Sequence, residues 1–161
     1  MDDILKLLQE NARLTAKEIA AMVNRSEDSV EKAITKLEHD GVIIKYGAII
    51  NHEKLPQKKD LVRAWIEIKV RPEREKGFDS LADRIARFPQ VNSLYLMSGG
   101  YDFLALVEGE TLQEVAFFVS EKLATIERVQ GTGTHFMLKK YKENNTMITG
   151  SEKTQRLSVT P

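Results

Sequence analysis

The sequence contains no cysteine among its 161 residues. This absence excludes a disulfide framework and any metal site built on thiolates. A chain of this length buries enough apolar surface to fold without cross-links, either as one large domain or as two small ones.

Long apolar runs are also missing. No stretch approaches the roughly 18 apolar residues that a membrane-spanning helix needs. The opening segment, MDDILKLLQEN, is acidic and amphipathic, unlike the basic leader and apolar centre of a secretory signal. We therefore expect a soluble, cytoplasmic protein with no membrane partner.

The chain has no net charge, since 24 basic side chains balance 24 acidic ones. No global positive field therefore indicates a nucleic-acid partner. Residues 1–52 carry seven basic and nine acidic side chains, and residues 53–142 carry fifteen and thirteen. DNA binding by the first segment would then depend on a local arrangement of charges.

Residues 2–50 show helical apolar spacing three times, which predicts three short helices around one core. Thr15 and Glu18 form a capping box at the start of the second helix, and Ser26 is the expected N-cap of the third. About three residues separate these two helices, as in a helix-turn-helix. The three apolar stripes are Ile4, Leu5 and Leu8, then Ile19, Ala20 and Val23, then Val30, Ile34 and Leu37.

Gly41 ends the third helix, and VIIKYGAII after it predicts a two-strand wing that turns around Lys45 to Gly47. Residues 1–50 are thus expected to form a winged helix-turn-helix. The polar segment 51–60 contains Pro56 and lacks periodicity, so we place the linker there.

The pattern then changes to that of a β-sheet domain, residues 61–142. LVRAWIEIKVR alternates strictly, with Ala64, Ile66 and Ile68 on one face and Trp65 on the other. The expected order is strand, helix, strand, strand, helix, strand, which is a ferredoxin-like αβ sandwich (βαββαβ) and makes the chain α+β. The later elements are a helix from about Glu75 to Phe88, strands VNSLYLMS and YDFLALV, a helix from Thr111 to about Leu123 and a strand near THFMLKKY.

Two helices cover only one face of such a sheet, yet several strands are apolar on both faces, with Tyr95 opposing Leu94 and Phe103 opposing Leu104. Sheet-to-sheet packing of a partner subunit, anchored by Trp65, would cover the second face. The alternative is an amphipathic sheet with a few exposed aromatic residues. The tail, residues 143–161, is polar apart from RLSV near its end, and the sequence does not decide between disorder and docking on a neighbour.

The outward face of the third helix carries the candidate DNA contacts. Asp28 is placed to accept a hydrogen bond from cytosine N4, and Lys32 and Lys36 to bind phosphates or guanine. Glu27 has a structural explanation, because a carboxylate in the first turn is favoured by the helix dipole. The alternative for the whole face is ordinary solvated charge, since three-helix units also bind proteins. The DNA-binding candidates are Arg25, Ser26, Asp28, Ser29, Lys32 and Lys36.

The chain resembles the Lrp/AsnC ("feast/famine") transcriptional regulators from Asp3 to about Tyr141. The resemblance rests on the order and spacing of ILKLLQENARLTAKEIA, VNRSEDSVEKAITKLEHDGVI, YGAIIN, WIEIKV and SGGYDFLALVEG. It implies double-stranded DNA as a partner, dimers formed through the sheets, often assembled into octamers, and an amino acid or related small-molecule effector. Relatives commonly carry Arg at the position of Ala33, and the recognition helix here is more acidic than many.

The segment SGGYDF resembles the family's Gly-x-x-Asp turn at the ligand pocket. Backbone N–H groups at Gly99 and Gly100 would bind an α-carboxylate, Asp102 an α-ammonium group, and Tyr101 would line the pocket. The alternative is an ordinary tight turn. The effector-binding candidates are Ser98, Gly99, Gly100, Tyr101 and Asp102, with Thr132 and Thr134 added by resemblance.

Two other functions compete with that of a regulator. Some Lrp/AsnC-like proteins resemble sirohaem decarboxylases, but His39, His52 and His135 have no metal-ligand spacing, and the chain has no phosphate loop or nucleophile elbow. We therefore expect no catalytic activity, no cofactor and no metal. The second competitor is a sensor or assembly protein whose acidic first domain has lost DNA binding.

Overall fold

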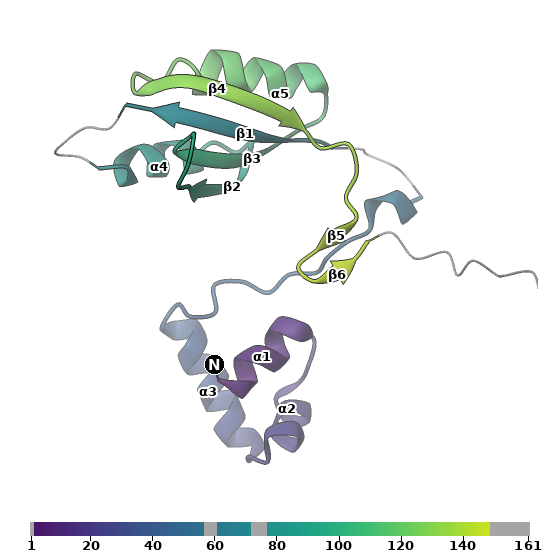
Figure 1. Cartoon of the computed structure of the whole chain (residues 1–161). Helices are drawn as coiled ribbons and strands as arrows, with labels where there is room; N and C mark the ends of the chain where they lie inside the picture. The colour runs from purple at the N-terminus through teal and green to yellow at the C-terminus, as the bar shows by residue number, and fades with distance from the viewer. Residues whose placement is uncertain (1, 57–60, 72–76, 149–161) are drawn as a thin grey trace, which may run out of the picture. The chain divides into compact units, whose positions relative to one another are not determined.

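The computed structural model describes residues 2–56, 61–71 and 77–148 (Figure 1). The chain divides into two compact units between Ile50 and Asn51. The first contains three helices and the second an antiparallel four-stranded sheet with two helices, which is the expected α+β class. No helix within the described ranges is long and apolar enough to cross a bilayer.

The three helices of the first unit are α1 (Asp3–Glu10), α2 (Ala16–Val23) and α3 (Glu27–His39). The capping box on α2 is confirmed: the Thr15 N–H donates to Glu18 Oε2 at 2.7 Å, and the Glu18 N–H donates to Thr15 Oγ1 at 3.2 Å. Ser26 caps α3 by accepting from the Ser29 N–H at 3.3 Å. These side chains accept hydrogen bonds from amide groups that the first helical turn leaves free, so α2 and α3 begin directly after their capping residues.

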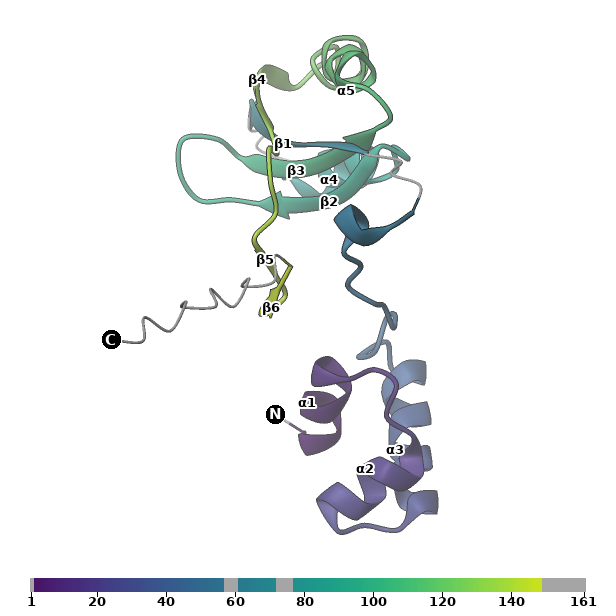
Figure 2. The same ribbon diagram turned by 90° about the vertical axis from the view of Figure 1, so that its right-hand side faces the viewer.

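One apolar core holds these helices together. Leu14 and Ile43 pack at its edge, while Leu5 and Leu37, which the helical spacing placed in the stripes, are partly exposed. Figure 2 shows the three helices from the side. The buried side chains are Ile4, Leu8, Ile19, Ala20 and Val30.

The strand pair expected around Lys45 to Gly47 is not formed. Residues 42–50, all within the described part, carry no strand, and Ile44 is 90% exposed. An isolated two-stranded hairpin is marginally stable in water, and within residues 42–50 only Ile43 is partly buried. Instead, the Tyr46 hydroxyl donates to Glu38 Oε1 at 2.8 Å, which ties this segment to α3.

The second unit follows the expected βαββαβ order. Its strands are β1 (Val62–Val70), β2 (Val91–Leu96), β3 (Phe103–Gly109) and β4 (Val129–Phe136), arranged β2-β3-β1-β4. Helix α4 (Asp79–Ala86) follows β1, and α5 (Leu112–Phe118) continues into a π-helical turn, Val119–Leu123. The expected start of α4 near residue 75 lies outside the described residues.

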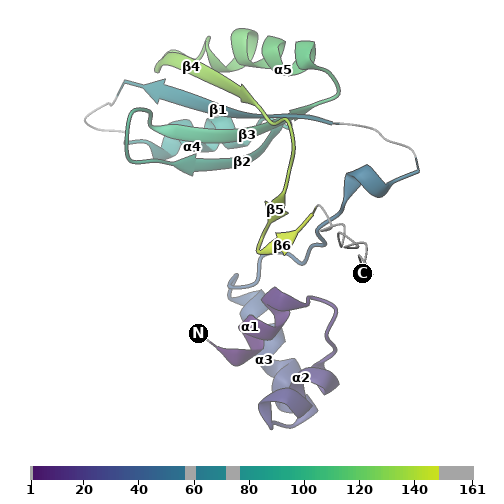
Figure 3. The same ribbon diagram turned by 45° about the vertical axis from the view of Figure 1, so that its right-hand side comes forward.

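Both helices cover the same face of the sheet, as Figures 1 and 3 show. Ala64, Ile66 and Ile68 are fully buried beneath them, as the alternation of β1 predicted. Burying each isoleucine contributes about 1.5–3 kcal/mol, so this apolar layer is a main source of stability in the unit. Leu81 and Ile85 of α4 and Val115 and Phe118 of α5 complete the core.

A short hairpin of β5 (Lys142–Glu143) and β6 (Thr146–Met147) follows the sheet (Figure 3). Its two turn residues, Asn144 and Asn145, have φ angles of 41° and 62°, the left-handed region that a type I′ turn requires. The polar composition from residue 143 onward predicted a tail, so this hairpin was missed. The rest of that tail, residues 149–161, lies outside the described residues.

Candidate functional site

The outward face of α3 presents the predicted DNA contacts. Asp28, Lys32 and Lys36 are exposed, and Ser29 is partly exposed. Asp28 Oδ2 lies 2.7 Å from Lys32 Nζ, and the two side chains are 74% and 75% exposed. The structure thus joins two candidates in an ion pair within the helix, while Lys36 follows one turn later.

The turn before α3 supplies the other two candidates. Asn24 closes α2 in the left-handed conformation with φ 52°, and the Arg25 N–H donates to the Ala20 carbonyl at 3.0 Å. Arg25 and Ser26 are both exposed. The Ser26 hydroxyl already caps the helix, so its first role is structural.

The 98–102 turn carries the predicted effector contacts. Ser98, Gly99 and Gly100 are exposed, and Gly99 has φ 143°, which favours glycine. The Asp102 carboxylate is engaged within the fold, since Oδ2 accepts from the Val70 N–H at 2.8 Å. The oxygen expected to meet an α-ammonium group therefore fastens the turn to β1.

Thr132 and Thr134 lie on the other side of β1 from this turn. Thr132 is paired with Ile68, whose carbonyl also accepts from the Asp102 N–H at 3.0 Å. Strand spacing therefore puts Thr132 about 10 Å from Asp102, two strand separations away, and Thr134 farther away along β4. Thr134 is paired with Ile66, so both threonines lie on the helix-covered side, at the edge of the sheet.

Two hollows occur elsewhere in this unit. The larger, about 840 Å³, runs along α5 and is lined by Phe117 and Lys122 among others. A smaller one of about 280 Å³ lies beside Glu108 and Glu110. The 98–102 turn lines neither of these two hollows.

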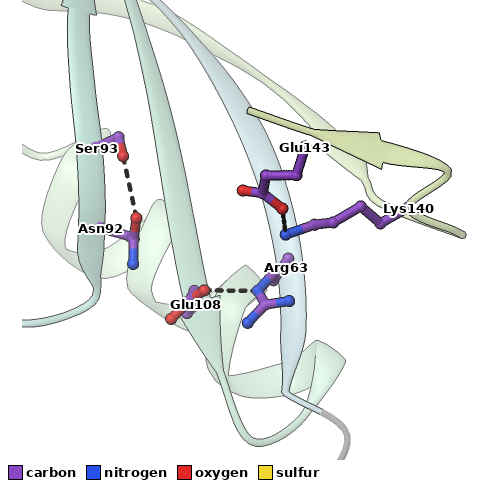
Figure 4. A network of polar contacts seen from close by, with 6 residues as sticks. All are labelled: Arg63, Asn92, Ser93, Glu108, Lys140 and Glu143. Carbon is purple, nitrogen blue, oxygen red and sulfur yellow. Dashed lines mark hydrogen bonds and ion pairs between the residues drawn. The ribbon is translucent and has the colours of Figure 1, made fainter. Parts of the chain in front are cut away.

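The face of the sheet opposite the helices carries contacts that sequence reasoning missed. Arg63 Nε lies 2.6 Å from Glu108 Oε1, with both side chains mostly buried (Figure 4). His135 Nε2 lies 3.3 Å from Glu67 Oε1. Both pairs depend on strand register, which alternation alone does not specify.

Aromatic and aliphatic side chains share this open face. The Trp65 and Tyr95 rings lie 6.4 Å apart, and Tyr95 is 51% exposed. Leu106 is paired with Trp65, and Leu104 with Tyr95, so all four side chains lie on the same side of the sheet. The apolar second face expected from the sequence is therefore present.

Tyr46 and the three histidines are titratable groups outside the predicted contacts. Desolvation, and then the nearby Glu38 carboxylate, raise the pKa of Tyr46. His39, His52 and His135 lie on α3, in the 3₁₀ helix His52–Lys54 and on β4, which are the separate positions expected for them.

Known proteins match this architecture in both units. A family model for a winged helix-turn-helix DNA-binding domain matches residues 3–44, and one for the Lrp/AsnC ligand binding domain matches residues 63–147. The HTH-type transcriptional regulator YugG of Bacillus subtilis is 42% identical over 159 residues, which cover 99% of this chain and 95% of that protein.

Solved structures agree with these matches. The transcriptional regulator NMB0573 of Neisseria meningitidis, determined as a complex with L-Met, has a TM-score of 0.69 at 26% identity, covering 89% of this chain and 93% of that one. The leucine response regulatory protein LrpA of Mycobacterium tuberculosis shares the fold, with a TM-score of 0.72 at 23% identity over 92% of this chain and 100% of that one. The chain therefore belongs to the Lrp/AsnC family of DNA-binding transcriptional regulators, with a helix-turn-helix unit followed by a ligand-binding domain.

Proposed function

We propose that this regulator binds double-stranded DNA through the outward face of α3, forms dimers and larger homo-oligomers through its second domain, and responds to an amino acid or similar metabolite. The observation that carries the DNA-binding part is the exposed pair Lys32 and Lys36, one turn apart on the second helix of a helix-turn-helix. That helix enters the major groove in such motifs, and its lysines then reach phosphates or guanine.

The open sheet face supports dimer formation. Trp65, Tyr95, Leu104 and Leu106 form an apolar centre, and the Arg63–Glu108 and Glu67–His135 pairs border it. Apolar aromatic residues surrounded by charged ones are typical of protein interfaces. Packing of two such faces would complete a two-sheet core, and further assembly, up to an octamer, would place several α3 helices on one DNA molecule.

The effector is expected at or near the 98–102 turn. The L-Met complex of the Neisseria relative supports an amino acid as the ligand class. The exposed Gly99 and Gly100 leave room for close approach of a carboxylate to the backbone, and a neighbouring subunit would supply the missing wall of the pocket.

Fluorescence anisotropy on the DNA upstream of the protein's own gene tests this proposal. The protein is titrated with and without L-Met, and then with a mixture of amino acids, over a range of salt concentrations. We expect binding tighter than to random DNA, weakened by salt and shifted by at least one amino acid. Equal affinity for both DNAs under every condition would contradict the proposal and favour a sensor that has lost DNA binding.

A further inference from the structure

The acidic and basic side chains of α3 are separated around the helix axis. With a turn of about 100° per residue, Glu27, Glu31 and Glu38 fall on one flank of the helix. Lys32 and Lys36 fall toward the opposite flank, and all five side chains are exposed. The helix therefore presents an acidic side and a basic side on either side of its outward face.

This segregation restricts how α3 lies in a major groove. Phosphates line both walls of the groove, and the acidic flank is repelled by them. The electrostatic energy of binding is most favourable when the helix turns Lys32 and Lys36 toward one wall of the groove and keeps Glu31 away from the phosphates of the other. In that orientation Asp28, which lies between the flanks near the helix N-terminus, faces the base edges.

The ion pair between Asp28 and Lys32 competes with the contacts that these side chains make to DNA. An exposed pair of this i, i+4 type is worth only about a twofold change in equilibrium. The 2.7 Å contact is therefore exchanged when both side chains gain new partners on DNA. Lys32 can move to a phosphate, but Asp28 then needs a new hydrogen-bond donor in the groove, because an unpaired carboxylate near DNA is unfavourable.

Bases that offer such a donor in the major groove are few. Cytosine presents its N4 amine and adenine its N6 amine, while guanine and thymine present acceptors there. Adenine sets the N7 acceptor directly beside its amine, which a carboxylate disfavours. Cytosine is therefore the best partner for Asp28.

We propose that Asp28 is a specificity-determining residue, which holds Lys32 away from phosphates on non-specific DNA and selects cytosine at one position of each half-site. This inference rests on the proposed binding of DNA through α3. On the selected base, Asp28 accepts from cytosine N4 and releases Lys32 to the backbone. On other sequences, the ion pair persists and the helix makes one phosphate contact fewer.

Selection from a randomised duplex library, with the full-length protein, tests the role of Asp28. Three proteins are compared: the wild type, Asp28→Ala, and Glu31→Ala as a control that removes an equal charge from the same helix. The exposed position of Asp28 makes alanine compatible with folding, and thermal unfolding checks this. The salt dependence of binding to random DNA is measured for each protein.

We expect the wild type to prefer cytosine about tenfold at one position per half-site. Asp28→Ala should lose that preference alone and bind random DNA more tightly, with a salt slope steeper by about 0.9, the value of one added phosphate contact. Glu31→Ala should keep both the preference and the slope.

Two results would overturn the inference, and they are distinguishable. If Asp28→Ala selects the same sequences as the wild type, or if both variants change binding equally, Asp28 acts only through its charge. If the wild type itself selects no sequence, DNA recognition through α3 fails, and the proposed function fails with it.

Discussion

The Asp102 carboxylate accepts a hydrogen bond from the Val70 N–H, with 2.8 Å between Oδ2 and the nitrogen. The Asp102 N–H in turn donates to the Ile68 carbonyl at 3.0 Å. These two bonds fasten the turn between β2 and β3 to β1, an inner strand of the sheet. The residue predicted to meet the effector's ammonium group thus has a structural role in shaping the turn.

Replacing Asp102 by Ala is expected to lower the free energy of unfolding by about 1–3 kcal/mol, because the partly buried Val70 amide loses its charged acceptor. Urea unfolding of the full chain measures this. Ser98→Ala, an exposed change in the same turn, should stay within about 0.5 kcal/mol of the wild type. Unchanged stability of Asp102→Ala, combined with lost effector binding, would assign Asp102 to the ligand alone.

Truncation of Trp65 tests the open sheet face. Trp65→Ala removes the largest apolar side chain of this face, and we expect dimer dissociation to become at least about tenfold more favourable. Sedimentation equilibrium gives the dissociation constant. Phe117→Ala serves as the control, because this side chain, 68% exposed, belongs to α5 on the helix-covered side. A dimer unaffected by Trp65→Ala but weakened by Phe117→Ala would place the interface on α5.

Gly109 marks the close approach of α5 to β3. A Cβ built on Gly109 would lie 3.0 Å from Val115 Cγ2, a buried atom with little freedom to move. Gly109→Ala should therefore destabilise the protein by about 1–3 kcal/mol in thermal or urea unfolding. Gly100→Ala is the matched control, since no atom lies within 4 Å of its added Cβ. Equal stability of the two variants would show that α5 adjusts freely.

The capping box of α2 predicts a pH dependence of stability. Hydrogen bonds from the Thr15 backbone N–H and hydroxyl hold the pKa of Glu18 below its ordinary value of 4.5. Because the folded pKa is depressed, this contribution is present above pH 4.5 and is lost as the pH falls through the folded value.

Thermal unfolding between pH 7 and about pH 3 checks this dependence. The difference in thermal stability between the wild type and Glu18→Gln should become smaller as the pH falls. Thr15→Ala should lower the free energy of unfolding by about 1 kcal/mol at neutral pH. A difference in thermal stability between Glu18→Gln and the wild type that stays constant down to about pH 3 would argue against the capping interaction.

Local signals in the sequence predicted much of the fold. The caps at Thr15 and Ser26 mark helix starts because short polar side chains satisfy the free amides there. The alternation around Trp65 identified both faces of β1, because successive side chains of a strand point to opposite sides. The helical period of 3.6 residues placed Asp28 on the outward face of α3, and the structure has it exposed.

Contacts between distant residues were beyond these signals. Arg63 and Glu108 are 45 residues apart, and only the register of β1 on β3 brings them together. The bond of Asp102 to the Val70 amide likewise depends on tertiary packing. By contrast, the hairpin turn at Asn144 and Asn145 had a local signal, because asparagine tolerates positive φ better than most residues.

The strand pair expected around Lys45 to Gly47, by contrast, was predicted wrongly. The apolar residues from Val42 to Ile50 have strand-like composition, but composition does not provide a pairing partner. In the single chain, Ile44 and Ile50 remain exposed and the segment carries no strand within the described ranges.

The salt dependence of DNA binding by Lys32→Ala/Lys36→Ala, compared with the wild type, tests the central claim most directly. Lys122→Ala/Lys142→Ala is the control, since it removes two exposed lysines from the other unit. On the DNA upstream of the protein's own gene, we predict weaker binding and a slope of log affinity against log salt that is shallower by about 1.8, the value of two phosphate contacts, with the control unchanged. An unchanged slope in the α3 variant would contradict the assignment of this helix as the DNA-reading element.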